Sequence, residues 1–199
     1  MAERGAFAVS LREINAAAGQ RNASSVQYHF GGREGLIGAV VERHMTVVDA
    51  RRSEICDALE AEGRFGDVCA LCDALARPLA EQLATASGRR YLRILPELAS
   101  RLGAAMGDAI VGNANASLRR VGERLFEAAA ALGDRIAAER SALVSGSMLH
   151  ALAHEARRID AGRSSADPAS IAFIAANLAD VLAAVVTAPA SAETRRLAG

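Results

Sequence analysis

The chain has 199 residues, about half of them apolar, and its 23 basic side chains, all arginine, are balanced by 23 acidic ones. A net charge of zero excludes a protein that binds nucleic acid through its overall charge, so any such binding must be local. Few prolines, abundant helix-forming residues and the absence of alternating β-branched runs predict an all-α fold of one or two domains.

The N-terminal part of the chain contains the clearest helix signals. Ser10, followed three residues later by Glu13, predicts a capping box at the start of a helix. Gly19 is placed to end that helix as a C′ residue, and the glycine pair 31–32 separates the next two helices. The expected helices here cover residues 11–18, 23–29 and 33–59.

The second of these helices has the composition of a helix that enters a DNA groove. Such a helix needs short polar side chains near base edges, groups that contact phosphates, and an apolar face that anchors it. The base-facing set is Ser24, Ser25 and Gln27. The phosphate-facing set is Tyr28, His29 and Arg33, joined by Ser10 and Arg12 at the start of the preceding helix. The anchoring set is Ile14, Val26 and Phe30.

This pattern indicates a helix-turn-helix head with a mild local excess of arginine over acid between residues 10 and 33. On pattern alone, an ordinary pair of surface helices with a polar face explains it about equally well. A more specific signal comes from a set of residue types at fixed spacing. These are Ala18-Gly19, Tyr28-His29-Phe30, Arg33-Glu34 and Leu36. With these, the segment resembles the DNA-binding part of the TetR family of transcriptional repressors.

The resemblance covers residues 1–50 and implies specific roles. It assigns Tyr28, His29 and Arg33 to phosphates and residues 24, 25 and 27 to bases. It also implies a homodimer that binds a palindromic double-stranded DNA operator and releases it when a small-molecule effector enters the helical body. The turn at residues 19–23 is one residue longer than the family's usual turn.

A second departure concerns the helix with which the family's head begins. Residues 1–4 resemble the end of that helix, and the rest of it has no counterpart in the given sequence. Two interpretations stay open: the natural start lies upstream, or the chain is a truncated member. The alternative function is therefore a dimeric small-molecule-binding protein whose head no longer binds DNA.

The rest of the chain is expected to form amphipathic helices, and Asp167-Pro168 marks the start of the last one. Residues 51–187 would be the ligand-binding and dimerisation domain, and residues 188–199 a flexible tail. The expected body helices cover residues 65–85, 88–101, 104–131 with a possible break near Gly112, 135–159 and 168–186.

The last two helices are the expected dimer interface, because the final one is more apolar than its own core requires. The interface residues are predicted to be Ser147, His150, Ala151, His154, Ile171, Ile174, Leu178, Val181 and Leu182. An apolar pocket for a lipophilic effector is expected among residues 65–131. His150 and His154 supply only two metal ligands, and the three cysteines are expected to be buried thiols.

No cofactor, metal site or membrane span is expected, and the protein is predicted to be cytoplasmic. An enzyme is not favoured, because the sequence offers no nucleophile–base–orienter set and no phosphate loop.

Overall fold

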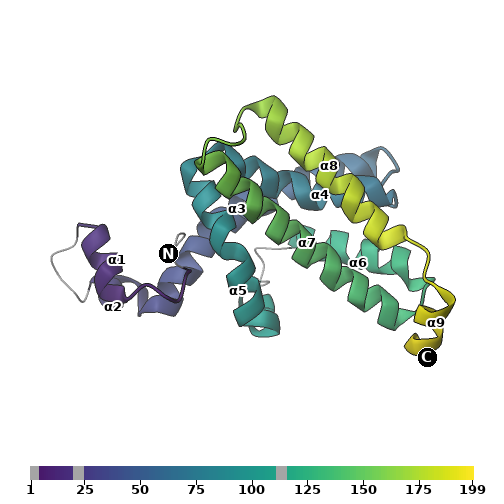
Figure 1. Ribbon diagram of the computed structural model, residues 1–199, viewed down its shortest axis with the longest axis horizontal. Coiled ribbons are helices and arrows are strands. Elements are labelled where there is room, and N and C mark those ends of the chain that lie inside the picture. Colours follow the sequence, from purple (N-terminus) through teal and green to yellow (C-terminus); the bar gives the residue numbers. More distant parts are fainter. Residues whose placement is uncertain (1–4, 20–24, 111–115) are drawn as a thin grey trace.

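The computed structural model describes residues 5–19, 25–110 and 116–199, with the side chains of 102–110 left out of the description. Every regular element in these ranges is helical, so the prediction of an all-α fold is confirmed (Figure 1). The elements are α1 (Leu11–Ala17), α2 (Ser25–Phe30), α3 (Arg33–Ala61), α4 (Val68–Ala80), the 3₁₀ helix η1 (Glu81–Ala84), α5 (Ala86–Ile110), α6 (Ala116–Ala130), α7 (Asp134–Asp160), α8 (Pro168–Thr187) and α9 (Ala192–Ala198).

Helix α1 begins with the predicted capping box. The Ser10 hydroxyl accepts a hydrogen bond from the Glu13 amide at 3.2 Å, and the Glu13 carboxylate accepts one from the Ser10 amide at 2.8 Å. Gly19 follows the helix at φ 67°, in the left-handed region that favours glycine. Both ends of α1 are therefore set by the residues that the sequence pattern identifies.

Helix α3 connects the two ends of the molecule. Figure 1 shows α1 and α2 together at one end of α3, with α4 to α8 gathered around its other half. One stripe of α3 is buried along its whole length, at spacings of three and four residues, because these positions share one face of a helix. The stripe consists of Ile37, Val41, Met45, Val48, Arg52, Cys56 and Leu59.

The core of the body lies between α4 and α8, which pack together more extensively than any other pair of helices. Nine of the thirteen residues of α4 are buried, so this short helix lies in the middle of the bundle. Helix α7 packs against α5, α6 and α8. Both α4 and α8 begin with an aspartate N-cap, Asp67 and Asp167, which accept hydrogen bonds from the first amides of their helices.

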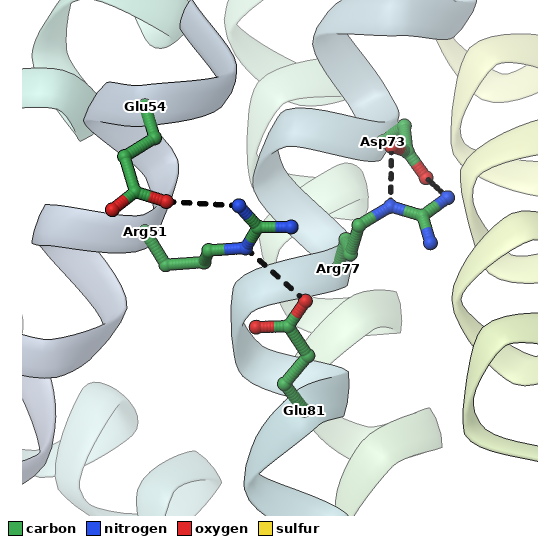
Figure 2. A network of polar contacts seen from close by, with 5 residues as sticks. All are labelled: Arg51, Glu54, Asp73, Arg77 and Glu81. Carbon is green, nitrogen blue, oxygen red and sulfur yellow. Dashed lines mark hydrogen bonds and ion pairs between the residues drawn. The ribbon is translucent and has the colours of Figure 1, made fainter. Parts of the chain in front are cut away.

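A surface network ties α3 to the end of α4 (Figure 2). Arg51 donates to Glu54 at 2.8 Å on its own helix and to Glu81 at 3.3 Å across the interface. Arg77 makes a two-point contact with Asp73 one turn earlier, at 2.7 and 2.6 Å. These side chains are all at least partly exposed, so the ion pairs add little to the stability of the fold.

Two helix predictions were wrong. Helix α5 continues to Ile110, whereas the sequence pattern divided this stretch between two helices; a glycine inside a helix costs only about 1 kcal/mol relative to alanine, so it does not by itself end one. The predicted flexible tail contains helix α9, which Ser191 caps. Arg135 of α7 donates to the Leu197 carbonyl at 2.9 Å, which explains why this segment is held against the body.

The end of α7 is attached to α5 by Asp160, which accepts hydrogen bonds from Arg89 at 2.6 Å and Arg93 at 3.3 Å. The hydrogen bond from Arg89 is the main reason why the pKa of Asp160 lies below its ordinary value. A lowered folded-state pKa stabilises the fold above the unfolded pKa of about 3.9, and this contribution is lost as the pH falls through the folded value.

Asp160→Asn is therefore expected to lower the free energy of unfolding by about 1–2 kcal/mol at neutral pH. Urea titrations at pH 7 and at about pH 3 check this, because the difference from the wild type should shrink at the lower pH. A difference of equal size at both values would show that the charge of Asp160 is not responsible.

Candidate functional site

The exposed surface of α2 contains three of the residues that the sequence predicted to contact DNA. Gln27, Tyr28 and His29 are exposed, and the Tyr28 side chain is 84% accessible. The rings of Tyr28 and His29 meet edge to face, with 5.1 Å between their centroids. The Gln27 amide nitrogen donates to the Gly31 carbonyl at 3.3 Å, so this side chain reaches back over the end of its own helix. The helix thus presents an aromatic and imidazole pair that has no hydrogen-bond partner among the body residues that the structure describes.

The other predicted DNA contacts are placed differently. Arg12 is exposed, and the Ser10 hydroxyl is engaged with Glu13, to which it also donates at 2.8 Å. Ser25 is half-buried, and Ser24 lies outside the described residues. Arg33 is half-buried and donates from Nη1 to the Ala6 carbonyl at 3.0 Å, so part of its guanidinium is used inside the protein.

The anchoring face of α1 and α2 agrees with the sequence only in part. Val26 is buried as predicted, and Ile14 is half-buried. Phe30 was predicted to point inward, but 40% of it is exposed, because α2 ends at this residue and the chain turns at Gly31 and Gly32, with φ of 69° and 119°. Asn15 of α1 is buried, although the pattern did not select it.

A set of contacts, here called the head–body contact, joins the N-terminal segment to α5. It consists of Ala6, Phe7, Arg33, Glu97 and Arg101. The Ala6 amide donates to the Glu97 carboxylate at 2.6 Å, while the Ala6 carbonyl accepts from Arg33. The Arg101 guanidinium lies 4.7 Å above the Phe7 ring centroid and 3.6 Å from the other oxygen of Glu97. Helix α5 is therefore bonded directly to the segment that precedes α1.

The four residues predicted for the interface on α7 are all exposed. Ser147, His150, Ala151 and His154 follow one another at helical spacing along one face of the helix. The Nδ1 atom of His150 lies 2.9 Å from the Gly146 carbonyl. A carbonyl can only accept, so Nδ1 of His150 donates in this contact.

The predictions for α8 need a correction. Ile171, Leu178 and Leu182 are buried within the chain and cannot meet a second copy, because α8 packs this face against α4. Val181 is 50% exposed and Ile174 is half-buried, as an interface requires. The sequence pattern missed Phe173, which is 70% exposed. Its adjacency to Ile174 on the outer face of an apolar helix was the available signal.

Helix α8 is long and apolar enough to cross a membrane by length and composition, and 39% of its most apolar window is buried in the chain. It carries Asp180 on its exposed side, and its other face belongs to the core. Such an apolar helix, covered on one face only, leaves a surface that water does not favour.

A polar cluster inside the body was not predicted. Arg52 of α3 and Tyr91 of α5 are each 1% exposed. The Tyr91 ring stacks on His44 at 4.4 Å between centroids, and His44 is hydrogen-bonded to Gln82 at 2.9 Å. The sequence signal existed, since Arg52 lies four residues from both Val48 and Cys56 on the buried stripe.

The expected apolar pocket is small in the part of the chain that the structure describes. A cavity of about 110 Å³ lies between α4, α6 and α7, below the range usual for drug-sized ligands. Its lining includes Leu75, Leu118, Leu125, Val144 and Met148. Two hollows of about 280 Å³ lie beside α8, one of them next to Arg77 and Glu81.

No cluster of three or more metal-ligating side chains occurs among the described residues. Cys56 and Cys72 are buried as predicted, but Cys69 is exposed. Burial raises the pKa of the Cys72 thiol to about 12, so the Cys69-x-x-Cys72 pair does not supply two thiolates.

The chain matches no protein-family model, no curated protein and no solved structure. The case for its function is therefore made by the motif in residues 18–36 and by the geometry described above.

Proposed function

We propose that this protein is a dimeric, ligand-responsive transcriptional regulator of the TetR type, which binds a palindromic operator and releases it when an effector occupies the body. The observation that carries the proposal is the exposed pair Tyr28 and His29 on α2, a helix whose buried residue is Val26. A helix anchored by a buried side chain, with hydrogen-bonding rings left exposed, has the form needed to meet a DNA backbone.

The supporting charges are few but well placed. Arg12 is exposed in the first turn of α1, next to the helix N-terminus. The Arg12 guanidinium supplies a positive charge for a phosphate there, although the Ser10 and Glu13 amides already have partners in the capping box. A short helix of this kind reads few bases, so specific binding requires two heads, one on each half-site of the operator.

Dimerisation would use the outer faces of α7 and α8, which pack against each other. Phe173 and Val181 give this surface its apolar part, the small residues Ser147 and Ala151 of α7 allow close approach, and His150 and His154 are its polar groups. An interface of this composition, apolar at the centre with polar groups beside it, is typical of homodimers.

The response to an effector would pass through α5. This helix carries Tyr91 inside the body and Glu97 in the head–body contact. A displacement of α5 changes the position of the Ala6 backbone, and Arg33 ties that backbone to the start of α3. The head and the body thus both contact α5, and a change in either can alter the position of this helix.

The alternative is a dimeric small-molecule-binding protein whose head does not bind DNA. Two observations favour it: Phe30 is exposed, and the Ser10 hydroxyl and one nitrogen of Arg33 already have partners within the chain. The exposure of Phe30 leaves α2 less well anchored than the motif implies. The partners of Ser10 and Arg33 leave fewer groups free to contact phosphates.

Selection of double-stranded DNA from a random pool separates the two functions. The regulator should enrich a palindrome, and binding should weaken steeply as salt rises. Tyr28→Ala combined with His29→Ala is expected to reduce affinity about tenfold to a hundredfold, because hydrogen bonds to phosphates are lost.

Val47→Thr on the exposed side of α3 is the matched control, since Val47 lies outside the DNA-binding set and should leave affinity unchanged. Failure to enrich any sequence, with a folded dimer in hand, would favour the alternative.

A further inference from the structure

We infer that Arg52 and Tyr91 form an internal anion site that binds the carboxylate of a small, otherwise apolar monocarboxylic acid. The inference deepens the proposed function, because it assigns a chemical class to the effector. It concerns a pair of donors on α3 and α5, away from the DNA-binding surface.

The main observation is that both side chains are buried with hydrogen-bond donors unused. Neither Nε nor Nη1 of Arg52 has a hydrogen-bond partner in the described protein, and neither does the Tyr91 hydroxyl. Buried polar groups are nearly always hydrogen-bonded, and exceptions call for an acceptor that occupies the site at some stage of function. Two such groups, close enough to influence each other electrostatically, indicate one shared acceptor.

The position of the Tyr91 hydroxyl is fixed by the contacts of its ring. The ring stacks on His44 with only 5° between the planes, and Gln82 fixes the imidazole in turn. The ring therefore has a defined contact with His44 of α3, while its hydroxyl has no hydrogen-bond partner among the described residues. A tyrosine kept only for packing would serve equally well as phenylalanine.

The charge of Arg52 is only partly compensated. The closest carboxylate oxygen is Oδ1 of Asp49, 3.7 Å from Nη1, too long for a hydrogen bond, and that oxygen also accepts a short hydrogen bond from Ser117. Burial lowers the pKa of Arg52 and outweighs the opposing effect of Asp49. An additional negative charge beside Arg52 would therefore be favourable.

The surroundings select a monocarboxylate over a phosphate. One guanidinium and one phenol supply the charge and donors for a single negative charge, whereas a buried phosphate dianion would need further cations. The neighbours on the same helix faces are apolar: Val48 and Cys56 on α3, and Ile94 and Leu98 on α5. A ligand with an apolar body and one carboxylate fits such a lining.

Entry of this ligand requires movement, because both donors are closed off from solvent. Helix α6, which brings Ser117 to Asp49, and helix α5 cover the site. A shift of α5 would reach the head–body contact through Glu97, six residues beyond Tyr91. Occupancy of the site and the position of the head are thus linked through one helix.

The test is direct binding in the absence of DNA. Benzoate, octanoate and decanoate are titrated into the full chain by calorimetry and thermal unfolding, each against its matched alcohol. At least one carboxylate is expected to raise the melting temperature by several degrees and to bind at least about tenfold more tightly than its alcohol, as a charge-assisted hydrogen bond requires.

Two variants assign the effect to this site. Tyr91→Phe removes only the hydroxyl and should weaken carboxylate binding about fivefold to fiftyfold while leaving alcohol binding unchanged. Arg52→Met should remove the preference for the carboxylate. Unliganded Tyr91→Phe should melt at the same temperature as the unliganded wild type or higher, because an unpartnered buried donor is lost.

The proposal is overturned if no carboxylate binds with a Kd below about 1 mM, if the alcohols bind equally well, or if Arg52→Met keeps the preference. A lower melting temperature of unliganded Tyr91→Phe would also overturn it, since a resident water would then be the partner of the hydroxyl. These readouts use no DNA, so failure of the proposed regulator and failure of this site are distinguishable.

Discussion

Gly35→Ala is expected to abolish DNA binding while the helical body stays folded. A Cβ on Gly35 would overlap the carbonyl oxygen of Phe30 and lie 2.8 Å from its carbonyl carbon. Because both partners are backbone atoms, no side-chain rotation relieves the clash, and the corner between α2 and α3 must open. The residues that α2 presents to DNA would then lose their position relative to α3.

The expected cost of this substitution is about 2–4 kcal/mol, confined to the head. Hydrogen exchange of α1 and α2 amides should become fast, with α4 and α8 unchanged, and the selected operator should no longer bind. Gly38→Ala is the matched control, because nothing lies within 4 Å of a Cβ at that position one turn further along α3. There alanine should be neutral or stabilising by about 1 kcal/mol, since it is the better helix former.

Equal behaviour of the two alanine variants would show that the tight corner is not required. Loss of operator binding in Gly38→Ala alone would show that the head is arranged differently.

The second large effect is expected on α8. Phe173→Asp combined with Val181→Asp should convert a dimer into a monomer, because two charges would have to be buried in an apolar interface without partners. Both side chains are at least half exposed in the single chain, so the fold should be unaffected. Operator affinity should fall at least about a hundredfold, since one head then reads one half-site.

Val47→Asp is the matched control for this experiment. Val47 is 60% exposed, like Val181, but lies on α3 away from the proposed interface. Sedimentation of wild type, control and double variant, followed by operator titration, gives the result. A wild type that sediments as a monomer, or a double variant that stays dimeric, would contradict the interface. Binding of wild type to lipid vesicles would instead assign the apolar face of α8 to a membrane surface.

The predictions from sequence were correct where a short segment by itself determines the local structure. The Ser10–Glu13 capping box, the turn at Gly19 and the Asp167-Pro168 start of α8 all depend on contacts within a few residues, and all are present. These signals do not depend on the rest of the fold. The exposure of Tyr28 and His29 was correct for the same reason, since α2 has one buried position, Val26.

The predictions from sequence failed where the burial of a residue depends on which other helix covers its face. Periodicity marked the apolar residues of α8 but could not tell that α4 covers Ile171, Leu178 and Leu182 and leaves Phe173 outside. Arg51 and Arg52 look equivalent as a pair, yet one lies in a surface network and the other in the core. The spacing of the apolar residues places position 52 on the stripe of α3, but the packing of α5 and α6 that buries a charged side chain there is a long-range property.

Because α3 is long, a small tilt of this helix at its body end produces a larger displacement at the end that carries α2. Its 29 residues span about 44 Å at 1.5 Å per residue, with α2 at one end and the body helices on the other half. A tilt of about 5° about the far end displaces the near end by about 4 Å. In the proposed two-fold dimer both copies of α3 would tilt, so the distance between the heads would change by about 8 Å, about a quarter of the roughly 34 Å between successive major-groove sites.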